Sequence, residues 1–349
     1  MTALGTEEGA FVPDLTLWHR WHTAHGTLPE AWKGMGLPEV SHALGVPAWV
    51  AARPWRLELD GASAETTETG TERVTRWTAG SRVLQAKWVR GPDGDWWQAE
   101  YPVKSADDLD AALAVVEARR YAVDEAALAA TGAAAGGDGL PALELPMRPY
   151  SELFHNFLGW AEGLMILLER PEAVQRLLDA LERLLQELVG RIATAPAGIL
   201  LSPDNLDGSF IPPAAFEEHL APSYRRTCGT LHAAGKRLVV HVGGMCRGLL
   251  PGLAGAGVDA VEGVCGAPQS DASIAEARAL SGPGVTLWGG VAQDLLLPAT
   301  GGEVFERGAR AALSEVRVNG PAMLGVADRV PVEAVPDRLA ALARMARDG

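Results

Sequence analysis

The sequence predicts an α/β fold, a parallel (β/α)8 barrel with an antiparallel β excursion near its start. Short apolar runs alternate with long amphipathic segments from residue 140 onward, and repeated units of this kind call for a parallel sheet covered by helices. No GxGxxG motif follows a first strand, which disfavours a doubly wound dinucleotide-binding sheet. The length of 349 residues allows two domains, or one barrel of about 250 residues with insertions. We expect one barrel domain over residues 1–349, with the excursion at residues 50–104.

The first hundred residues differ from the rest in their aromatic content. Nine of the eleven tryptophans lie at or before Trp97, so this region forms a layer of its own. Its segment LTLWH, at residues 15–19, is interpreted as the first barrel strand. Short runs rich in Val, Trp and Tyr, separated by Gly, Asp and Pro turn signals, predict the antiparallel strands at residues 55–60, 72–80, 81–89 and 96–103.

Residues 105–130 open with a Ser N-cap, carry Asp in the first turn and continue with helical periodicity, which predicts a helix. The stretch 131–139 is too rich in Gly to continue that helix. Six apolar runs then predict barrel strands at residues 142–145, 198–202, 237–242, 260–264, 285–290 and 322–328. Helices are expected between them, at residues 150–195 (two helices), 213–234, and from about 246, 271, 302 and 333.

Charge and composition exclude several classes of partner. The chain has 30 Lys and Arg against 44 Asp and Glu, a net charge of −14, so its field repels nucleic acids and anionic membranes. The start lacks the apolar core of a signal peptide, and no stretch reaches about 18 apolar residues, so we expect a cytoplasmic protein. Its three cysteines, Cys228, Cys246 and Cys265, form no CxxC pair, which argues against a disulfide framework.

The candidate site residues share one property: each lies at or just after the carboxyl end of a predicted strand, where parallel barrels carry their chemistry. As catalytic residues we select Arg20, His22, Asp204, His241 and Glu262. As substrate-binding residues we select His19, His25, Arg148, Tyr150, Asn205, Asp207, Trp288 and Asp328. Asp204, Asn205 and Asp207 are equally well interpreted as turn formers.

The segment HRWHTAH places Arg20 and three histidines within seven residues. Arg20 offers a carboxylate two parallel hydrogen bonds, while a histidine moves a proton near neutral pH. The alternative is a solvated loop whose histidines only pack.

His241 ends an apolar run and precedes two glycines, so a ligand can approach it closely. Together with Cys265 and Asp328 it supplies the nitrogen, sulfur and oxygen ligands that suit zinc. The alternative is a structural histidine and no required cofactor.

The order and wording of several segments resemble the uroporphyrinogen decarboxylase superfamily, which also contains zinc methyltransferases that serve corrinoid proteins. The resemblance is carried by SPDNLDGSFIPPAAFEEHLAPSYRRTCGTLHAAGKRLVVHVGG, GLLPGLAGAGVDAVEGV, VTLWGGV and AMLGVADRVPVEAVPDRL. Upstream, LWHRWHTAHGTLPE is similar to the decarboxylase turn that ends in Leu-Pro-Glu, with Arg20 matching its first arginine. The resemblance implies a TIM barrel of the uroporphyrinogen decarboxylase type and, as in that decarboxylase, a homodimer.

This sequence departs from both activities of the superfamily. It has no counterpart of the decarboxylase's second arginine, and His25 lies near the position where that arginine is expected. It also has no counterpart of the decarboxylase's Phe-Ser-Asp segment. It has Gly243 where the methyltransferases have a cysteine two residues after the histidine, and approximately Asp328 where they have another. Three hypotheses follow: a decarboxylase of a small anionic substrate other than the haem precursor, a zinc-dependent methyltransferase centred on His241, or a non-catalytic ligand-binding barrel.

Overall fold

The computed structural model describes residues 1–92 and 94–348. They form two compact units, of which unit 1 comprises residues 1–53, 126–145 and 193–349, and unit 2 comprises residues 54–125 and 146–192. Unit 2 includes most of the expected excursion at residues 50–104. The expectation of one barrel domain over the whole chain stays a prediction.

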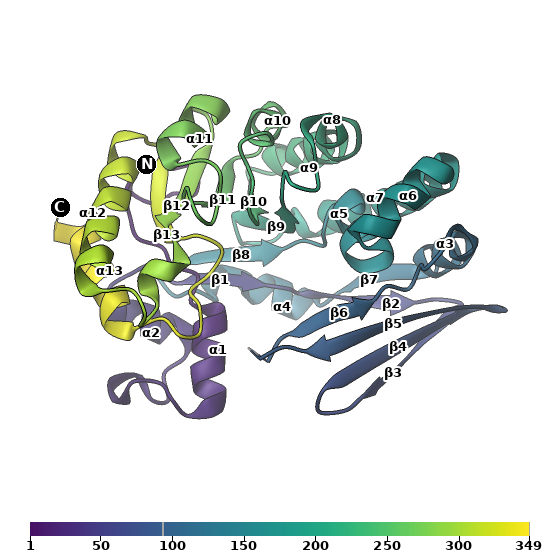
Figure 1. Ribbon diagram of the computed structural model, residues 1–349, viewed down its shortest axis with the longest axis horizontal. Coiled ribbons are helices and arrows are strands. Elements are labelled where there is room, and N and C mark those ends of the chain that lie inside the picture. Colours follow the sequence, from purple (N-terminus) through teal and green to yellow (C-terminus); the bar gives the residue numbers. More distant parts are fainter. Residues whose placement is uncertain (93, 349) are drawn as a thin grey trace. The chain divides into compact units, whose positions relative to one another are not determined.

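Unit 1 is built on a seven-stranded parallel sheet in the order β1-β8-β9-β10-β11-β12-β13 (Figure 1). The strands are β1 (Trp49–Ala52), β8 (Leu140–Glu144), β9 (Ile199–Leu206), β10 (Arg237–Val242), β11 (Ala260–Val264), β12 (Thr286–Val291) and β13 (Ala322–Val326). β10, β11, β12 and β13 are almost wholly buried, as expected for strands covered on both faces.

The sheet curls around an apolar core to which every one of its strands contributes. Trp49 in β1 and Trp288 in β12 lie far apart in the strand order, yet their ring centroids are 4.8 Å apart. Val12, Val239 and Met323 belong to the same buried cluster. A sheet can bring its first and sixth strands together only by curving strongly, so the strand ends converge at one mouth.

The eight-stranded barrel is confirmed only in part, because this sheet has seven strands. Next to β13, Phe11 forms a single parallel bridge with Leu324, and the Val12 amide donates to the Leu324 carbonyl oxygen. Within the described residues no strand pairing connects this segment to β1. The architecture is therefore a curled half-barrel.

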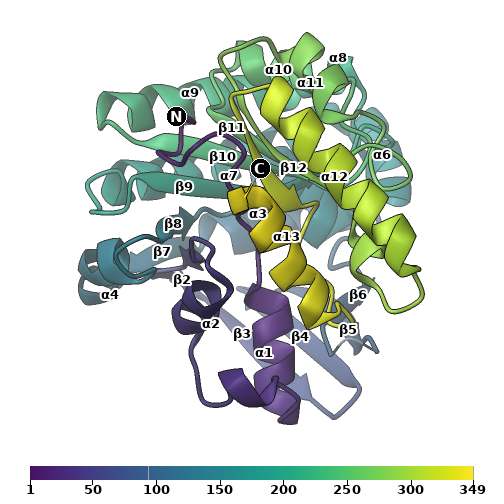
Figure 2. The same cartoon turned by 90° about the vertical axis from the view of Figure 1, so that its left-hand side faces the viewer.

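Helices of unit 1 connect the strands and cover the sheet. After the N-terminal α1 (Thr16–His25) and α2 (Leu37–Leu44), α4 (Glu125–Ala130) precedes β8, and α8 (Pro213–Ala215), a π-helical turn and α9 (Ala221–Ala233) connect β9 to β10. The later strands are followed by α10 (Leu250–Gly255), α11 (Ile274–Ser281), α12 (Gly302–Val318) and α13 (Pro336–Asp348). Figure 2 shows α12 and α13 side by side, in agreement with their contacts.

The interpretation of residues 15–19 as a strand is wrong, because Leu15 is the N-cap of α1 and residues 16–19 belong to this helix. Side chains four residues apart meet on this helix: the rings of Trp18 and His22 lie 4.4 Å apart, and those of Trp21 and His25 lie 3.9 Å apart. Five residues are too few to distinguish this spacing from strand alternation.

Unit 2 contains antiparallel strands where the tryptophan-rich region predicts them, and a further strand at residues 62–68 that was not predicted. One sheet has the order β3 (Ala62–Glu68), β4 (Glu72–Ala79), β5 (Arg82–Arg90), β6 (Trp96–Glu100). A second sheet pairs β2 (Trp55–Leu59) with β7 (Arg119–Val123). The helices are α3 (Leu109–Glu117), α5 (Pro149–Glu152), α6 (Trp160–Glu169) and α7 (Pro171–Ile192), with a π-helical segment over Leu153–Leu158.

The predicted continuous helix over residues 105–130 is also wrong, because β7 interrupts it. Tyr121 in β7 lies opposite Leu57 in β2, and its ring meets that of Trp55 at a centroid distance of 5.0 Å. This cross-strand packing outweighs the helical pattern on either side, since local propensity is weaker than tertiary contacts.

Candidate functional site

The most distinctive polar cluster lies at the carboxyl ends of β10, β11 and β13. His241 and Glu262 are paired in the register of the parallel strands β10 and β11, so both side chains leave the same face of the sheet. Nδ1 of His241 lies 2.5 Å from Oε2 of Glu262, and Nε2 lies 3.6 Å from Oδ1 of Asp328. The structure thus brings together three of the residues that the sequence selected.

The electrostatics of this cluster favour a protonated imidazole. Burial by itself lowers the pKa of His241, but the carboxylate of Glu262, followed by those of Asp328 and Asp14, raises that pKa to about 9. Burial raises the pKa of Glu262 to about 7, against the lowering effect of His241. At neutral pH the ring therefore carries a proton on both nitrogens, and Glu262 accepts from Nδ1.

Asp14 is the site residue that the sequence interpretation missed. It interacts electrostatically with His241, Glu262, Asp328 and Arg329, and burial raises its pKa. The available signal was the apolar run at residues 10–12, which ends just before it and whose Phe11 pairs with β13. Interpreting that run as a strand would have placed Asp14 at a strand end.

The glycine after Glu262 lets the two strands approach closely. Gly263 has a φ of +108°, and a Cβ there would lie 2.2 Å from the carbonyl oxygen of Val242. Any other residue would push β11 away from β10. The contact between His241 and Glu262 therefore depends on this glycine.

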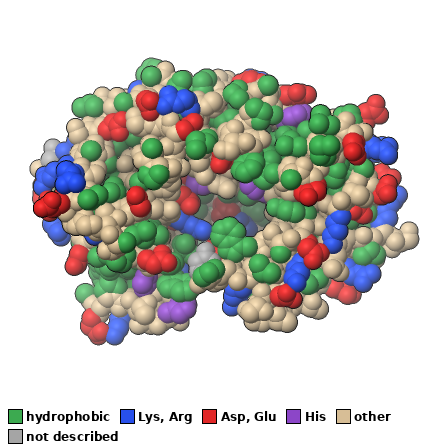
Figure 3. Space-filling model, in the orientation of Figure 1, with side chains coloured by type: hydrophobic (Ala, Val, Ile, Leu, Met, Phe, Trp, Pro, Cys, Tyr) green, Lys and Arg blue, Asp and Glu red, His purple; other side chains and the backbone are tan. Residues whose placement is uncertain are grey.

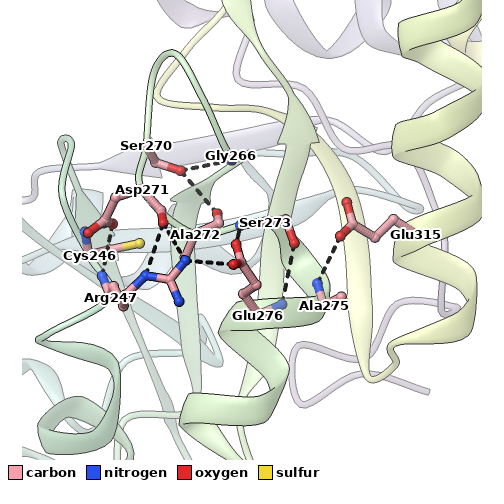
Figure 4. Close-up of polar contacts among 10 residues, drawn as sticks. All are labelled: Cys246, Arg247, Gly266, Ser270, Asp271, Ala272, Ser273, Ala275, Glu276 and Glu315. Carbon is pink, nitrogen blue, oxygen red and sulfur yellow. Dashed lines mark hydrogen bonds and ion pairs between the residues drawn. The ribbon is translucent and has the colours of Figure 1, made fainter.

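A polar network holds the loops that follow β10 and β11 (Figure 4). Oδ1 of Asp271 accepts from the amides of Cys246 and Arg247, at 2.7 and 3.0 Å. Nη2 of Arg247 donates to the carbonyl oxygen of Asp271 and forms an ion pair with Glu276. Oγ of Ser270 accepts from the Cys265 and Gly266 amides. Both loops are thus fixed to each other beside the strand ends.

The loop after β9 is also tied to the loop after β10. Oδ1 of Asp207 accepts from the amides of Ser209, at 2.7 Å, and Met245, at 3.3 Å. Asn205 is exposed with a φ of +49°. The structure therefore gives Asp207 the turn-forming contacts that the sequence also allowed.

Asp204 is fully buried rather than open to a substrate. Its Oδ2 accepts hydrogen bonds from the hydroxyls of Ser202, at 2.7 Å, and Tyr224. Trp288 is also in the core, where its indole N–H donates to the Val12 carbonyl oxygen at 2.9 Å. In unit 2, Arg148 and Tyr150 are buried, and the Tyr150 ring packs against Phe154.

The histidines of α1 make backbone contacts. Nε2 of His19 lies 2.9 Å from the Met35 carbonyl oxygen, Nε2 of His22 lies 2.8 Å from that of Val332, and Nδ1 of His25 lies 2.8 Å from that of Trp21. Nδ1 of His22 lies 2.7 Å from the hydroxyl of Thr27. These contacts agree with packing histidines, and Arg20 lies exposed on the same helix.

The residues expected to bind zinc do not fit such a site. Sγ of Cys265 donates to the Gly266 carbonyl oxygen at 3.4 Å, and burial raises the pKa of this thiol to about 11. A cysteine at position 243 would need Asn205 to move, because a Cβ there lies 1.8 Å from its Oδ1. Residues 1–92 and 94–348 contain no metal-binding group of three or more His, Cys, Asp or Glu.

Charged side chains of both signs are interspersed over the face drawn in Figure 3. None of the described helices combines the length and apolarity needed to cross a membrane.

One family model and one solved structure agree with the fold. A family model described as uroporphyrinogen decarboxylase (URO-D) matches residues 156–349. A solved methyltransferase from Methanosarcina mazei superposes with a TM-score of 0.57 at 15% identity, covering 99% of this chain and 96% of that one. A D-psicose 3-epimerase from Clostridium cellulolyticum H10 gives a TM-score of 0.31 at 12% identity, covering 59% of this chain and 86% of that one. No curated protein matches.

Proposed function

Since this chain belongs to the uroporphyrinogen decarboxylase family, we propose that it is an enzyme that decarboxylates a small anionic substrate other than the haem precursor. The observation that carries the proposal is the hydrogen-bonded pair of His241 and Glu262 at the strand ends. In this proposal His241 donates the proton and Glu262 positions its ring.

The chemistry requires a proton at one carbon atom. The bond between the carboxyl carbon and its neighbour breaks, carbon dioxide leaves, and the electron pair stays on the neighbouring carbon, which then takes a proton. An imidazolium with a pKa of about 9 holds that proton at neutral pH, and the side chain of His241 is 17% exposed. Because Nδ1 is engaged by Glu262, Nε2 is the nitrogen that donates.

Binding of the substrate carboxylate requires a cation near this pair. Arg20 is our proposed carboxylate ligand, because a guanidinium forms two parallel hydrogen bonds with such a group. Arg329, which interacts electrostatically with Asp14, is the alternative carboxylate ligand. Replacing by Lys whichever of these two arginines binds the substrate carboxylate should raise KM about tenfold to a hundredfold, with little change in kcat.

The proposal is tested by incubating the protein with a panel of small carboxylic acids and measuring carbon dioxide release. We expect release from at least one acid, and His241→Gln should lower kcat by about 10²-fold or more. The rate should fall above about pH 9, where His241 loses its proton. His42→Gln, at an exposed residue of α2, is the matched control. A rate unchanged by His241→Gln would rule out this role.

Methyl transfer is the second candidate, because the methyltransferase from Methanosarcina mazei covers nearly the whole chain. The poor fit of Cys265 and Gly243 to a zinc site counts against it. Methyl transfer to a small thiol that depends on added zinc, without carbon dioxide release, would establish it instead. Saturable binding of an acid without turnover by either route would identify a non-catalytic binding protein.

A further inference from the structure

Asp328 lies beside the nitrogen atom that donates the proton in the proposed reaction. Its Oδ1 is 3.6 Å from Nε2 of His241, and its side chain is 45% exposed. A substrate atom that takes a proton from Nε2 lies about 3 to 3.5 Å from this nitrogen. The same atom is therefore no more than about 7 Å from the Asp328 carboxylate.

Two glutamine side chains hold the backbone on either side of Asp328. Nε2 of Gln269 donates to the carbonyl oxygen of Ala327 at 3.2 Å, and Nε2 of Gln293 donates to that of Arg329 at 2.7 Å. The Gln293 amide in turn donates to Oε1 of Gln269 at 3.0 Å. Gln269 follows β11 and Gln293 follows β12, so these hydrogen bonds join the loops after three neighbouring strands.

The support is needed because Asp328 has a backbone conformation that favours glycine. Its φ is +66°, and a residue with a side chain persists in this region where the surrounding structure holds it. The hydrogen bonds from Gln269 and Gln293 to the two flanking carbonyl oxygens supply that support. They therefore keep the Asp328 carboxylate beside His241.

The charges of the cluster leave little positive charge for a substrate. Two cations, His241 and Arg329, stand against three carboxyl groups, those of Glu262, Asp328 and Asp14. Burial raises the pKa of Glu262 to about 7 and also raises that of Asp14. When both of these groups are protonated, two cations face one carboxylate, and one positive charge remains for a substrate.

We propose that Asp328 determines specificity by selecting substrates with a single carboxylate over dicarboxylates, and that Gln269 and Gln293 position it. This inference rests on the function proposed above, because it places the substrate at Nε2 of His241. One substrate carboxylate takes the available positive charge. A second carboxylate near the reacting carbon lies close to Asp328 and is repelled by it.

Calorimetric titration of the full chain with butyrate and succinate tests the selection without turnover. Succinate has a carboxylate where butyrate has a methyl group. We expect butyrate to bind at least tenfold more tightly than succinate, and Asp328→Asn to reduce this ratio at least tenfold. Equal affinities for the two acids, a ratio unchanged by Asp328→Asn, or no binding of either acid at millimolar concentration would overturn the proposal.

Acetoacetate and oxaloacetate form the corresponding pair for turnover, since both are 3-oxo acids and oxaloacetate carries the additional carboxylate. Asp328→Asn should raise kcat/KM for oxaloacetate relative to acetoacetate at least tenfold, after the spontaneous rates are subtracted. Preference for butyrate without carbon dioxide release from any acid would refute the decarboxylase function and leave the selection intact. Release that is equally efficient from both 3-oxo acids in wild type and variant would refute the selection alone.

The glutamines are tested by the same ratio of affinities, because a general loss of structure weakens the binding of both acids alike. Gln269→Leu and Gln293→Leu should each reduce the ratio, and neither should reduce it further when combined with Asp328→Asn. Asp348→Asn, exposed in α13, and Gln175→Leu, exposed in α7, are the controls and should keep the wild-type ratio. A wild-type ratio in folded Gln269→Leu and Gln293→Leu would refute the positioning role. If circular dichroism shows that either variant is unfolded, Asp328→Asn still decides the role of Asp328.

Discussion

Oε2 of Glu262 lies 2.5 Å from Nδ1 of His241, and the two residues are paired in the register of adjacent parallel strands. Backbone pairing therefore sets this contact, rather than a flexible loop. Side chains fixed by strand geometry lose little entropy when they form a hydrogen bond. The pair is thus preorganised before any ligand arrives.

The pair predicts a dependence of stability on pH. Because the pKa of His241 is raised from 6.5 to about 9, the folded chain binds this proton more tightly than the unfolded chain does. Its contribution is fully present below pH 6.5 and is lost as pH rises to about 9. We expect the free energy of unfolding to fall by about 1 to 3 kcal/mol over this range. Urea denaturation at several pH values measures it.

The raised pKa of Glu262 also makes the free energy of unfolding fall as pH rises, in this case from pH 4.5 to about 7. In His241→Gln the decrease between pH 6.5 and 9 should largely disappear, whereas His42→Gln should retain it. If His241→Gln kept the full decrease in unfolding free energy, the decrease would have to come from the titration of another group.

Removal of the partner carboxylate should lower the pKa of His241. In Glu262→Gln the buried imidazole loses its strongest stabilising charge, while burial still disfavours the charged form. NMR titration of the His241 ring should show a pKa lower by at least one unit. Asp328→Asn should cause a smaller decrease, since Asp328 is half-exposed and 3.6 Å away. An equal or larger effect of Asp328→Asn would contradict this order.

Gly263→Ala should be among the most destabilising small substitutions in β11. The new Cβ would lie 2.2 Å from a backbone oxygen of β10, and the φ of +108° is strained for alanine. We expect a loss of about 2 to 5 kcal/mol of unfolding free energy, measured by urea denaturation. Gly284→Ala is the control, because no heavy atom of the described chain lies within 4 Å of its added Cβ. Similar losses at both positions would contradict the steric argument.

Tyr224→Phe should destabilise unit 1 through Asp204. The hydroxyl of Tyr224 donates to this fully buried carboxylate, and its removal takes away one of the hydrogen bonds that the carboxylate accepts. The expected loss is about 1 to 3 kcal/mol in chemical denaturation. Ser202→Ala, which removes the other hydroxyl, should have a comparable effect. No loss in either variant would show that neither hydroxyl stabilises Asp204.

Several features were predictable because they depend on local pattern. The alternation of apolar runs and amphipathic segments located six of the seven parallel strands but not β1. The rule that site residues follow strand ends selected His241, Glu262 and Asp328. The same rule also selected Asp204 and Trp288, which the structure buries. Strand position does not reveal which side chains the core will cover.

The sequence by itself determined the six parallel strands from β8 to β13 and the residue types at their ends, because both follow from the hydrophobic period over a few residues. Only the tertiary structure decided that Phe11 pairs with Leu324, that residues 16–19 are helical and that Asp14 joins His241. The physical reason is that short segments are compatible with more than one conformation. Pairing and burial against residues distant in sequence select among these conformations, and those contacts have no local signature.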